Sequence, residues 1–423
     1  NHLIVNKSNP LIGTIPIPGD KSISHRSIIL GSLSVGQLKI SNFLTSTDCI
    51  ATVNAMKQLG ADITMDDNQV YINGNGLFGL KEPSDVIDAG NSGTLIRLLS
   101  GILAVQDFNS SITGDESLKK RPMARVIKPL VSCGASIESD DYKAPLKIIG
   151  SKSLSSINYK QDIASAQVKS CLMMSALYVD EESKFFEKTP TRDHTENLLE
   201  HLDCKIYRTD NSLTFRGRQQ LIAKDIVIGS DISSASFFIV AGLIMKDSCV
   251  EFTNVNINKY RTGILSVLKQ MGAHIEISNI QRISNEYVGD IKVKYSKLKP
   301  INIGGDIIPS LIDELPILFI ACSAASGVSK ISGIEELRYK ESDRIKAMED
   351  GLEAIGIKVS STQDSIEITG GKILGGKIDS YDDHRIAMSF AIAGLISETS
   401  LTIMNTRNIA TSFPNFVTLL KDL

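Results

Sequence analysis

Apolar and polar residues follow one another along the chain in a pattern that recurs six times. Each copy opens on a small or polar residue, continues as an almost wholly apolar stretch of helical length, and passes through a short β-rich run and a loop into a second helix. In the second helices, apolar residues return every three or four positions. The copies begin near Lys21, Asn91, Ser165, Asp231, Asp313 and Asp383.

The second helices share a glycine signal at their ends, and the runs between the helices have the character of strands. Four of these helices end on a glycine, the residue that most easily adopts the left-handed conformation of a helix cap. Short β-rich runs such as 70–72 and 291–293 predict strands. The four glycines are Gly60, Gly134, Gly272 and Gly356.

Six such repeats exceed one hydrophobic core, so a division into three and three predicts two domains of similar build. The runs IPIPG at 15–19 and IGS at 228–230 each precede a repeat and predict two crossover connections. We therefore expect one domain over residues 20–228 and a second made of residues 1–19 with 229–423. The apolar first helices leave little room for a wet face, so we expect them to be buried in an α/β fold.

Composition and charge exclude several classes of protein. The 423 residues carry 45 basic and 48 acidic side chains, a net charge of −3, and only 5 % are aromatic. No basic block is present, which argues against nucleic-acid binding. The longest apolar runs, 237–245 and 386–396, are shorter than the roughly 20 residues of a membrane-spanning helix.

The cysteine and histidine pattern indicates neither a disulfide framework nor a metal site. None of the six cysteines forms a C-x-x-C pair, and no H-E-x-x-H motif occurs. The first residues also lack the basic start and apolar stretch of a secretory signal. We therefore expect a cytoplasmic protein with reduced thiols and no bound metal.

The first helices of the repeats begin with polar and cationic side chains. A helix start presents unpaired N–H groups and partial positive charge, which suits an anion. A single Ser or Asp there is commonly just a cap worth about 1 kcal/mol. Several such starts with added cations, together with Arg121, Arg192 and Arg344 in the second loops, indicate a small ligand with several negative charges.

Three carboxylates do not suit an anion site. Asp313 and Glu341 can be salt-bridge partners of neighbouring cations, or they can move a proton on a bound anion. The sequence leaves both readings open for these two residues. Glu314 is interpreted as structural.

Several motifs, in order over essentially the whole chain, resemble those of the 5-enolpyruvylshikimate-3-phosphate synthases. The resemblance implies a two-domain inverted α/β barrel of six βαβαββ repeats, with helices buried inside each domain. It also implies an active site in the cleft between the domains and a hinge at the crossover strands. The motifs are GDKSISHR at 19–26, GNSGT at 90–94, KRPM at 120–123, ASAQVKS at 164–170, GDISSASFF near Asp231, DELP at 313–316, KESDR at 340–344, DHR at 383–385 and SFPNF at 412–416.

The resemblance also implies an activity: transfer of the enolpyruvyl group of phosphoenolpyruvate to the 5-hydroxyl of shikimate 3-phosphate, with release of phosphate, on the route to chorismate and the aromatic amino acids. For shikimate 3-phosphate it implies Lys21, Ser22, Arg26, Ser165, Ala166, Gln167, Arg192, Asp313 and Lys340. For phosphoenolpyruvate it implies Lys21, Gly93, Arg121, Gln167, Glu341, Arg344, His384 and Arg385.

The catalytic roles follow from the chemistry of the family. Asp313 is the expected base for the hydroxyl, and Lys21 and Glu341 are the candidates for moving protons at the methylene carbon. The resemblance implies no metal and no organic cofactor. The expected partners are the two small substrates, and the expected assembly is a monomer.

The chain departs from some members of the family. Ala166 stands where they carry a second serine, Arg192 where they carry a tyrosine-containing segment, and Thr411 where they carry a lysine. These differences resemble the subgroup called class II. Gly93 occupies the position where alanine accompanies tolerance of the inhibitor glyphosate, which argues for sensitivity, while the subgroup argues for tolerance.

Two alternatives remain for the function. The UDP-N-acetylglucosamine enolpyruvyl transferases share the repeats, but they generally carry a reactive cysteine before an Arg-Pro pair. Residues 114–121 read GDESLKKR and contain none. The other alternative is a non-catalytic repeat protein, which needs polar capping repeats. The final repeat, 386–396, is as apolar as the middle ones.

Overall fold

A computed structural model describes residues 1–422, which divide into two compact units. Unit 1 comprises residues 1–18, 229–281 and the chain from Tyr287 onward, and unit 2 comprises residues 19–228 and 282–286. Each unit has its own hydrophobic core. The short segment 282–286 is a hairpin tip that the sequence analysis placed with residues 229–423, whereas it clusters with unit 2.

Unit 2 contains three repeats of helices and short strands. The helices are α1 (Lys21–Ser32), α2 (Thr47–Gln58), α3 (Gly93–Leu103), α4 (Glu116–Lys120), α5 (Ala124–Ser132), α6 (Ala166–Ala176) and α7 (His194–His201). The strands are β3 (Val35–Ser41), β4 (Asp62–Asp66), β5 (Gln69–Asn75), β6 (Ile87–Asp88), β7 (Ser110–Thr113), β8 (Ser136–Asp140), β9 (Lys143–Ile149), β10 (Asn158–Lys160), β11 (Glu182–Phe186), β12 (Tyr207–Arg208), β13 (Ser212–Arg216) and β14 (Ile226–Val227).

Unit 1 has the same build, with added turns of 3-10 helix. Its α-helices are α8 (Ile232–Ile244), α9 (Gly263–Gln270), α10 (Leu315–Ala324), α11 (Arg344–Ala354), α12 (His384–Gly394) and α13 (Phe416–Asp422). The 3-10 helices are η1 (Gly305–Ser310), η2 (Ile312–Glu314), η3 (Glu335–Tyr339) and η4 (Thr406–Thr411). The strands are β1 (His2–Val5), β2 (Ile12–Thr14), β15 (Cys249–Asn256), β16 (His274–Ile283), β17 (Glu286–Lys294), β18 (Asn302–Ile303), β19 (Val328–Ser332), β20 (Lys358–Ser361), β21 (Ser365–Thr369), β22 (Gly376–Asp379) and β23 (Leu401–Met404).

Each repeat forms one small mixed sheet. Five of the sheets have four strands and one has three. In the second repeat, β6 pairs in parallel with β7, while β9 is antiparallel to both β7 and β8, which gives the order β6-β7-β9-β8. The orders β10-β11-β13-β12 and β18-β19-β21-β20 repeat this pattern. The same strand order therefore recurs in three of the sheets, whereas the three-stranded sheet has the order β1-β23-β22.

Two sheets are completed by strands from distant parts of the chain. In unit 2, β14 pairs in parallel with β3, with Ile226 opposite Ile40. In unit 1, β2 pairs in parallel with β15, with Ile12 opposite Cys249. The N-terminal strand β1 also lies in unit 1, antiparallel to β23. The runs 15–19 and 228–230 therefore follow directly after the two strands that complete these sheets.

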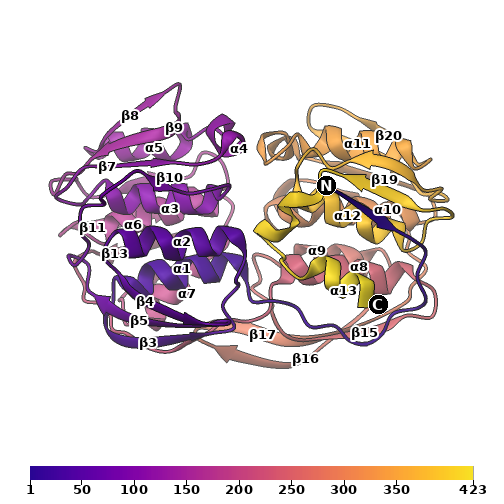
Figure 1. The fold of residues 1–423 in the computed structure, drawn as a ribbon, viewed down its shortest axis with the longest axis horizontal. Helices are drawn as coiled ribbons and strands as arrows, with labels where there is room; N and C mark the ends of the chain where they lie inside the picture. The colour runs from indigo at the N-terminus through magenta and orange to yellow at the C-terminus, as the bar shows by residue number, and fades with distance from the viewer. Residues whose placement is uncertain (423) are drawn as a thin grey trace. The chain divides into compact units, whose positions relative to one another are not determined.

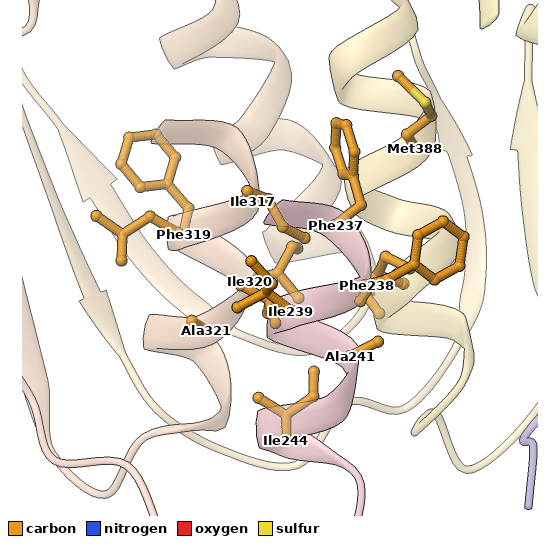
Figure 2. Close-up of a cluster of buried hydrophobic side chains, with 14 of the residues drawn as sticks. Phe237, Phe238, Ile239, Ala241, Ile244, Ile317, Phe319, Ile320, Ala321 and Met388 are labelled. Carbon is orange, nitrogen blue, oxygen red and sulfur yellow. The ribbon is translucent and has the colours of Figure 1, made fainter. Parts of the chain in front are cut away.

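The first helix of each repeat is buried, as a helix that is apolar on all sides requires. Every residue of α8 is buried, and its side chains pack against those of α10 and α12 (Figure 2). Phe238 of α8 also contacts the rings of Phe413 and Phe416, with ring centroids 6.0 and 5.5 Å apart. The predicted fold class, with helices inside each unit and sheets around them, is confirmed (Figure 1).

Helix ends follow the sequence closely, with one exception. The glycines after the second helices have φ values of +87°, +102°, +89° and +87° at positions 60, 134, 272 and 356. Asp20, Ser92 and Ser165 cap the starts of α1, α3 and α6 through their side chains. The copy at Asp313 differs, because that residue lies in the 3-10 turn η2, and Glu314, at the cap position of α10, makes no side-chain capping bond. None of the helices within residues 1–422 is long and apolar enough to cross a membrane.

Candidate functional site

Arg26 joins three helices of unit 2. It is 4 % exposed. Its Nε donates to Thr195 Oγ1 of α7 at 2.8 Å, and its Nη2 donates to Ser170 Oγ of α6 at 2.9 Å. The two hydroxyls are 2.7 Å apart, and Arg26 Nη1 donates to the Ser22 carbonyl at 3.0 Å. The guanidinium is thus fixed in one orientation beside the start of α1.

Lys21 stands at the first position of α1 and is paired with an acid of α2. Its Nζ lies 2.5 Å from Asp48 Oδ2, and the carboxylate is almost fully buried. His25, one turn further, is fully buried and shares a 2.6 Å hydrogen bond with Thr52. Burial, with added repulsion from Lys21 and Arg26, holds the pKa of His25 well below its usual value. The positive charge at this helix start therefore comes from lysine and arginine.

Gln167 connects the starts of α6 and α3. Its side-chain oxygen accepts a 2.6 Å hydrogen bond from Arg97, and its Nε2 donates to Thr94 Oγ1 at 3.0 Å. Ser165 caps α6, so Ala166 is the first helical residue. The predicted residues on these two helix starts are therefore brought together. Thr94 and Arg97, which hold Gln167, were not predicted.

Gly93, the first residue of α3, lies against Arg121. A Cβ placed on Gly93 would come within 2.7 Å of Cζ and of both terminal nitrogens of that guanidinium. Such a contact is too short, so any larger residue would displace the Arg121 side chain. Arg121 is buried, with 8 % exposure, and ends the short helix α4. Glycine is required here for the close approach of the guanidinium to the helix start.

Arg192 precedes α7 and is half-buried, and a buried ion cluster holds this segment. Lys169 Nζ lies 2.6 Å from Glu196 and 3.0 Å from Glu187, and its side chain is 1 % exposed. Thr191 donates a short hydrogen bond to Glu187. Burial alone would lower the pKa of Lys169, but the two carboxylates raise it, so the amine stays charged. The sequence analysis missed this cluster, although a lysine within the apolar helix α6 signals a buried partner.

Arg344 organises a cluster of charged side chains in unit 1, the Arg344 cluster. Its side chain is 1 % exposed, and its Nε and Nη2 donate to Asp383 at 2.8 and 3.3 Å. Nη2 also donates to Glu341 at 2.7 Å. Asp383 further accepts from Ser342 and from the backbone N–H of Arg385 in the first turn of α12. Burial works to raise the pKa of Asp383, but the Arg344 guanidinium holds it below the usual value.

Asp313 lies beside the same cations. Its Oδ1 is 3.5 Å from Lys340 Nζ and 3.8 Å from Arg344 Nη1. Nearby, α12 begins with His384, which is buried, and Arg385, which is half-buried. The structure thus brings together the site residues that were predicted within unit 1. Asp383, which holds Arg344 and caps α12, was quoted in a motif but given no role.

Glu314 belongs to a separate buried network. Ser233 donates a short hydrogen bond to Glu314 Oε1, and Arg261 donates to Ser233 at 2.7 Å. Arg261 also reaches Asp231, the cap of α8, at 3.4 Å. This network ties the starts of α8 and α10, in line with the structural role expected for Glu314. Within residues 1–422, no group of three or more His, Cys, Asp or Glu side chains is placed to hold a metal ion.

Comparisons with known proteins identify the family. The family model of EPSP synthase (3-phosphoshikimate 1-carboxyvinyltransferase) matches residues 5–420. The chain belongs to the EPSP synthase family. Similar members include a 3-phosphoshikimate 1-carboxyvinyltransferase of Legionella pneumophila, 47 % identical over 96 % of this chain and 94 % of that protein. One from Ruthia magnifica is 48 % identical over 98 % and 96 % of the two chains.

Solved structures agree with the EPSP synthase assignment. The EPSP synthase of Acinetobacter baumannii superposes with a TM-score of 0.89 at 41 % identity, covering 100 % of this chain and 98 % of that one. The enolpyruvyl transferase NikO from Streptomyces tendae gives a TM-score of 0.81 at 15 % identity, covering 100 % and 97 %. At that identity, NikO shares the fold alone.

Proposed function

We propose that this protein transfers the enolpyruvyl group of phosphoenolpyruvate to the 5-hydroxyl of shikimate 3-phosphate and releases phosphate. One observation supports the proposal most directly: Asp313, a carboxylate able to accept a proton, lies 3.5 Å from Lys340 and 3.8 Å from Arg344. The cations suit an anionic substrate, and the carboxylate suits its hydroxyl proton. The match of residues 5–420 to the EPSP synthase family supports the same activity.

The cationic helix starts of unit 2 and the Arg344 cluster of unit 1 each have a binding role in this proposal. Shikimate 3-phosphate is bound at the starts of α1 and α6 and at Arg192, with Asp313 and Lys340 completing its ligands. Phosphoenolpyruvate is bound by residues from the helix starts of unit 2 and from the Arg344 cluster of unit 1. Helix N–H groups and fixed guanidinium groups need no reorganisation when an anion arrives, which favours charge stabilisation during the reaction. The phosphoenolpyruvate ligands are Lys21, Gly93, Arg121, Gln167, Glu341, Arg344, His384 and Arg385.

The reaction proceeds by addition and elimination. Asp313 accepts the proton of the 5-hydroxyl while that oxygen bonds to C2 of phosphoenolpyruvate, and C3 takes up a proton. Loss of phosphate from C2 and of a proton from C3 then restores the double bond. Lys21 and Glu341 are the candidates for both proton transfers at C3. The cations around them balance the phosphate and carboxylate charges throughout.

A purified sample incubated with phosphoenolpyruvate and each of two acceptors tests the proposal. We expect phosphate release with shikimate 3-phosphate and none with UDP-N-acetylglucosamine. NMR of the product should show an enolpyruvyl ether at the 5-position. Release with the nucleotide sugar alone, or with neither acceptor, contradicts the proposed function.

We also propose that the protein acts as a cytoplasmic monomer. All six cysteines are free thiols, which fits a reducing compartment. Each unit closes its own hydrophobic core without a second chain. The proposed chemistry calls for no cofactor.

A further inference from the structure

The hairpin of β16 and β17 carries a tip that belongs to the other unit. The body of the hairpin lies in the sheet β16-β17-β15-β2 of unit 1, whereas residues 282–286 cluster with unit 2. The turn residues Ser284 and Asn285 have φ values of +47° and +66°. Positive φ at both central residues is the mark of a tight two-residue hairpin turn. Glu286 follows this turn directly.

The side chains of Ser284, Asn285 and Glu286 in the tip are all engaged in hydrogen bonds. Ser284 Oγ accepts from the Val227 N–H at 2.9 Å. Asn285 Nδ2 donates to the carbonyl of Asn197 at 3.0 Å and to Glu200 at 3.1 Å. The tip is therefore fixed against α7 by specific polar contacts.

Glu286 makes the most buried of these contacts. It is 6 % exposed, and its Oε1 lies 2.6 Å from His194 Nδ1 and 3.1 Å from Asn197 Nδ2. Both partners are on the first turn of α7, where a carboxylate is favoured by the partial positive charge of the helix start. The neighbouring charges there, Asp193 and Glu200, are paired with Arg208 at 3.2 and 2.9 Å.

The start of α7 depends on such contacts because it has no side-chain cap of its own. Asp193 stands at the cap position but accepts no hydrogen bond from the backbone of the first turn. The same turn carries Thr195, which orients Arg26, and it begins two residues after Arg192. Whatever fixes His194 therefore fixes the geometry of two proposed shikimate 3-phosphate ligands.

We propose that Glu286 is a positioning residue for the shikimate 3-phosphate side of the site, an inference that rests on the proposed function. It does not touch the substrate. It holds His194 and Asn197, and through them it sets Arg192 and the Thr195–Arg26 pair. The consequence is a specific defect in shikimate 3-phosphate binding when Glu286 is lost, with the chemical step preserved.

Kinetics and calorimetry of Glu286 variants test the inference. Glu286→Ala should raise both the KM and the Kd for shikimate 3-phosphate about tenfold, since hydrogen bonds to charged groups are lost. Its kcat and its KM for phosphoenolpyruvate should stay within about threefold of wild type. Glu286→Gln keeps an acceptor oxygen and should restore most of the affinity. Glu276→Ala is the matched control, because Glu276 pairs with His274 at 2.9 Å on the same hairpin but is 58 % exposed.

A folded Glu286→Ala variant with unchanged affinity for shikimate 3-phosphate overturns the inference, as does a fall in kcat with unchanged KM. If the alanine variant fails to fold, Glu286→Asp keeps the charge and shortens the reach, and the same rise in Kd is expected of it. Unchanged binding by the aspartate variant then overturns the inference. If the wild-type protein turns over both substrates and the Glu286 variants bind shikimate 3-phosphate as tightly as the wild type does, the proposed function stands. Only the positioning role of Glu286 is then lost. A wild-type protein that binds no shikimate 3-phosphate contradicts both.

Discussion

Replacing Asp313 by asparagine should lower kcat about a thousandfold, within the range that general acid–base catalysis contributes. The amide has nearly the same shape as the carboxylate, so it can still contact the substrate, but it cannot accept the proton of the 5-hydroxyl. The KM for shikimate 3-phosphate should change by less than about tenfold, because only one of several binding contacts is altered. Steady-state phosphate release at saturating concentrations of both substrates measures the effect.

A neighbouring acid provides the matched control for Asp313. Asp306 lies in the preceding 3-10 helix η1 and is exposed. Asp306→Asn should leave kcat near the wild-type value. Near-normal turnover by Asp313→Asn would show that another group takes the proton, and the proposed role of Asp313 would be lost.

Removing the guanidinium of Arg344 should have the largest effect on stability. Arg344→Ala leaves Asp383 buried without its cation, and breaking a buried ion pair in this way typically costs about 3 to 5 kcal/mol. Asp383 also caps α12, so the start of that helix loses its support. Differential scanning calorimetry should show the transition of unit 1 at a clearly lower temperature. Any remaining folded enzyme should need much more phosphoenolpyruvate.

An exposed ion pair next to the same acid serves as the comparison. Arg407 pairs with Asp382 at 2.9 Å, and the arginine is 66 % exposed. Exposed pairs contribute only about 0 to 1 kcal/mol, so Arg407→Ala should melt close to wild type. Arg344→Lys keeps the charge but cannot reproduce the three hydrogen bonds to Asp383 and Glu341. Its melting temperature should therefore lie between those of Arg344→Ala and Arg407→Ala. A wild-type melting temperature for Arg344→Ala would mean that Asp383 does not depend on this cation.

The regular parts of the fold were predictable because their signals are local. The 3.6-residue spacing around Val53 and Met56 places α2, and glycine at position 60 places its end, with no knowledge of the rest of the chain. The wholly apolar sequence of α8 predicts its burial for the same reason. Repetition of these local signals then predicted six repeats divided between two domains.

The pairing of β2 with β15 and of β14 with β3 could not be predicted in this way. The strands β2 and β14 have three and two residues, too few for any periodic pattern. Their pairing partners lie more than a hundred residues away, at 249–251 and 40–41. The hairpin tip at 282–286 has the same character, since nothing in its own sequence indicates that it docks on α7.

The candidate site was predictable as residue types but not as contacts. The resemblance to a known family supplied Arg26 and Gln167, whereas their partners are set by tertiary structure. Arg26 and Thr195, for example, are 169 residues apart in the sequence. Asp48, which pairs with Lys21, likewise has no local feature that distinguishes it from a surface acid. These supporting residues orient the predicted ones, and only the folded chain reveals them.

In the proposed function, the cationic helix starts of unit 2 and the Arg344 cluster of unit 1 bind the same ligands, so that shikimate 3-phosphate completes the site for phosphoenolpyruvate. Calorimetric titration of phosphoenolpyruvate into the Asp313→Asn variant tests it with little turnover. We predict weak binding to the variant alone and about a hundredfold tighter binding when shikimate 3-phosphate is saturating. Equal affinity in the two titrations would contradict the account.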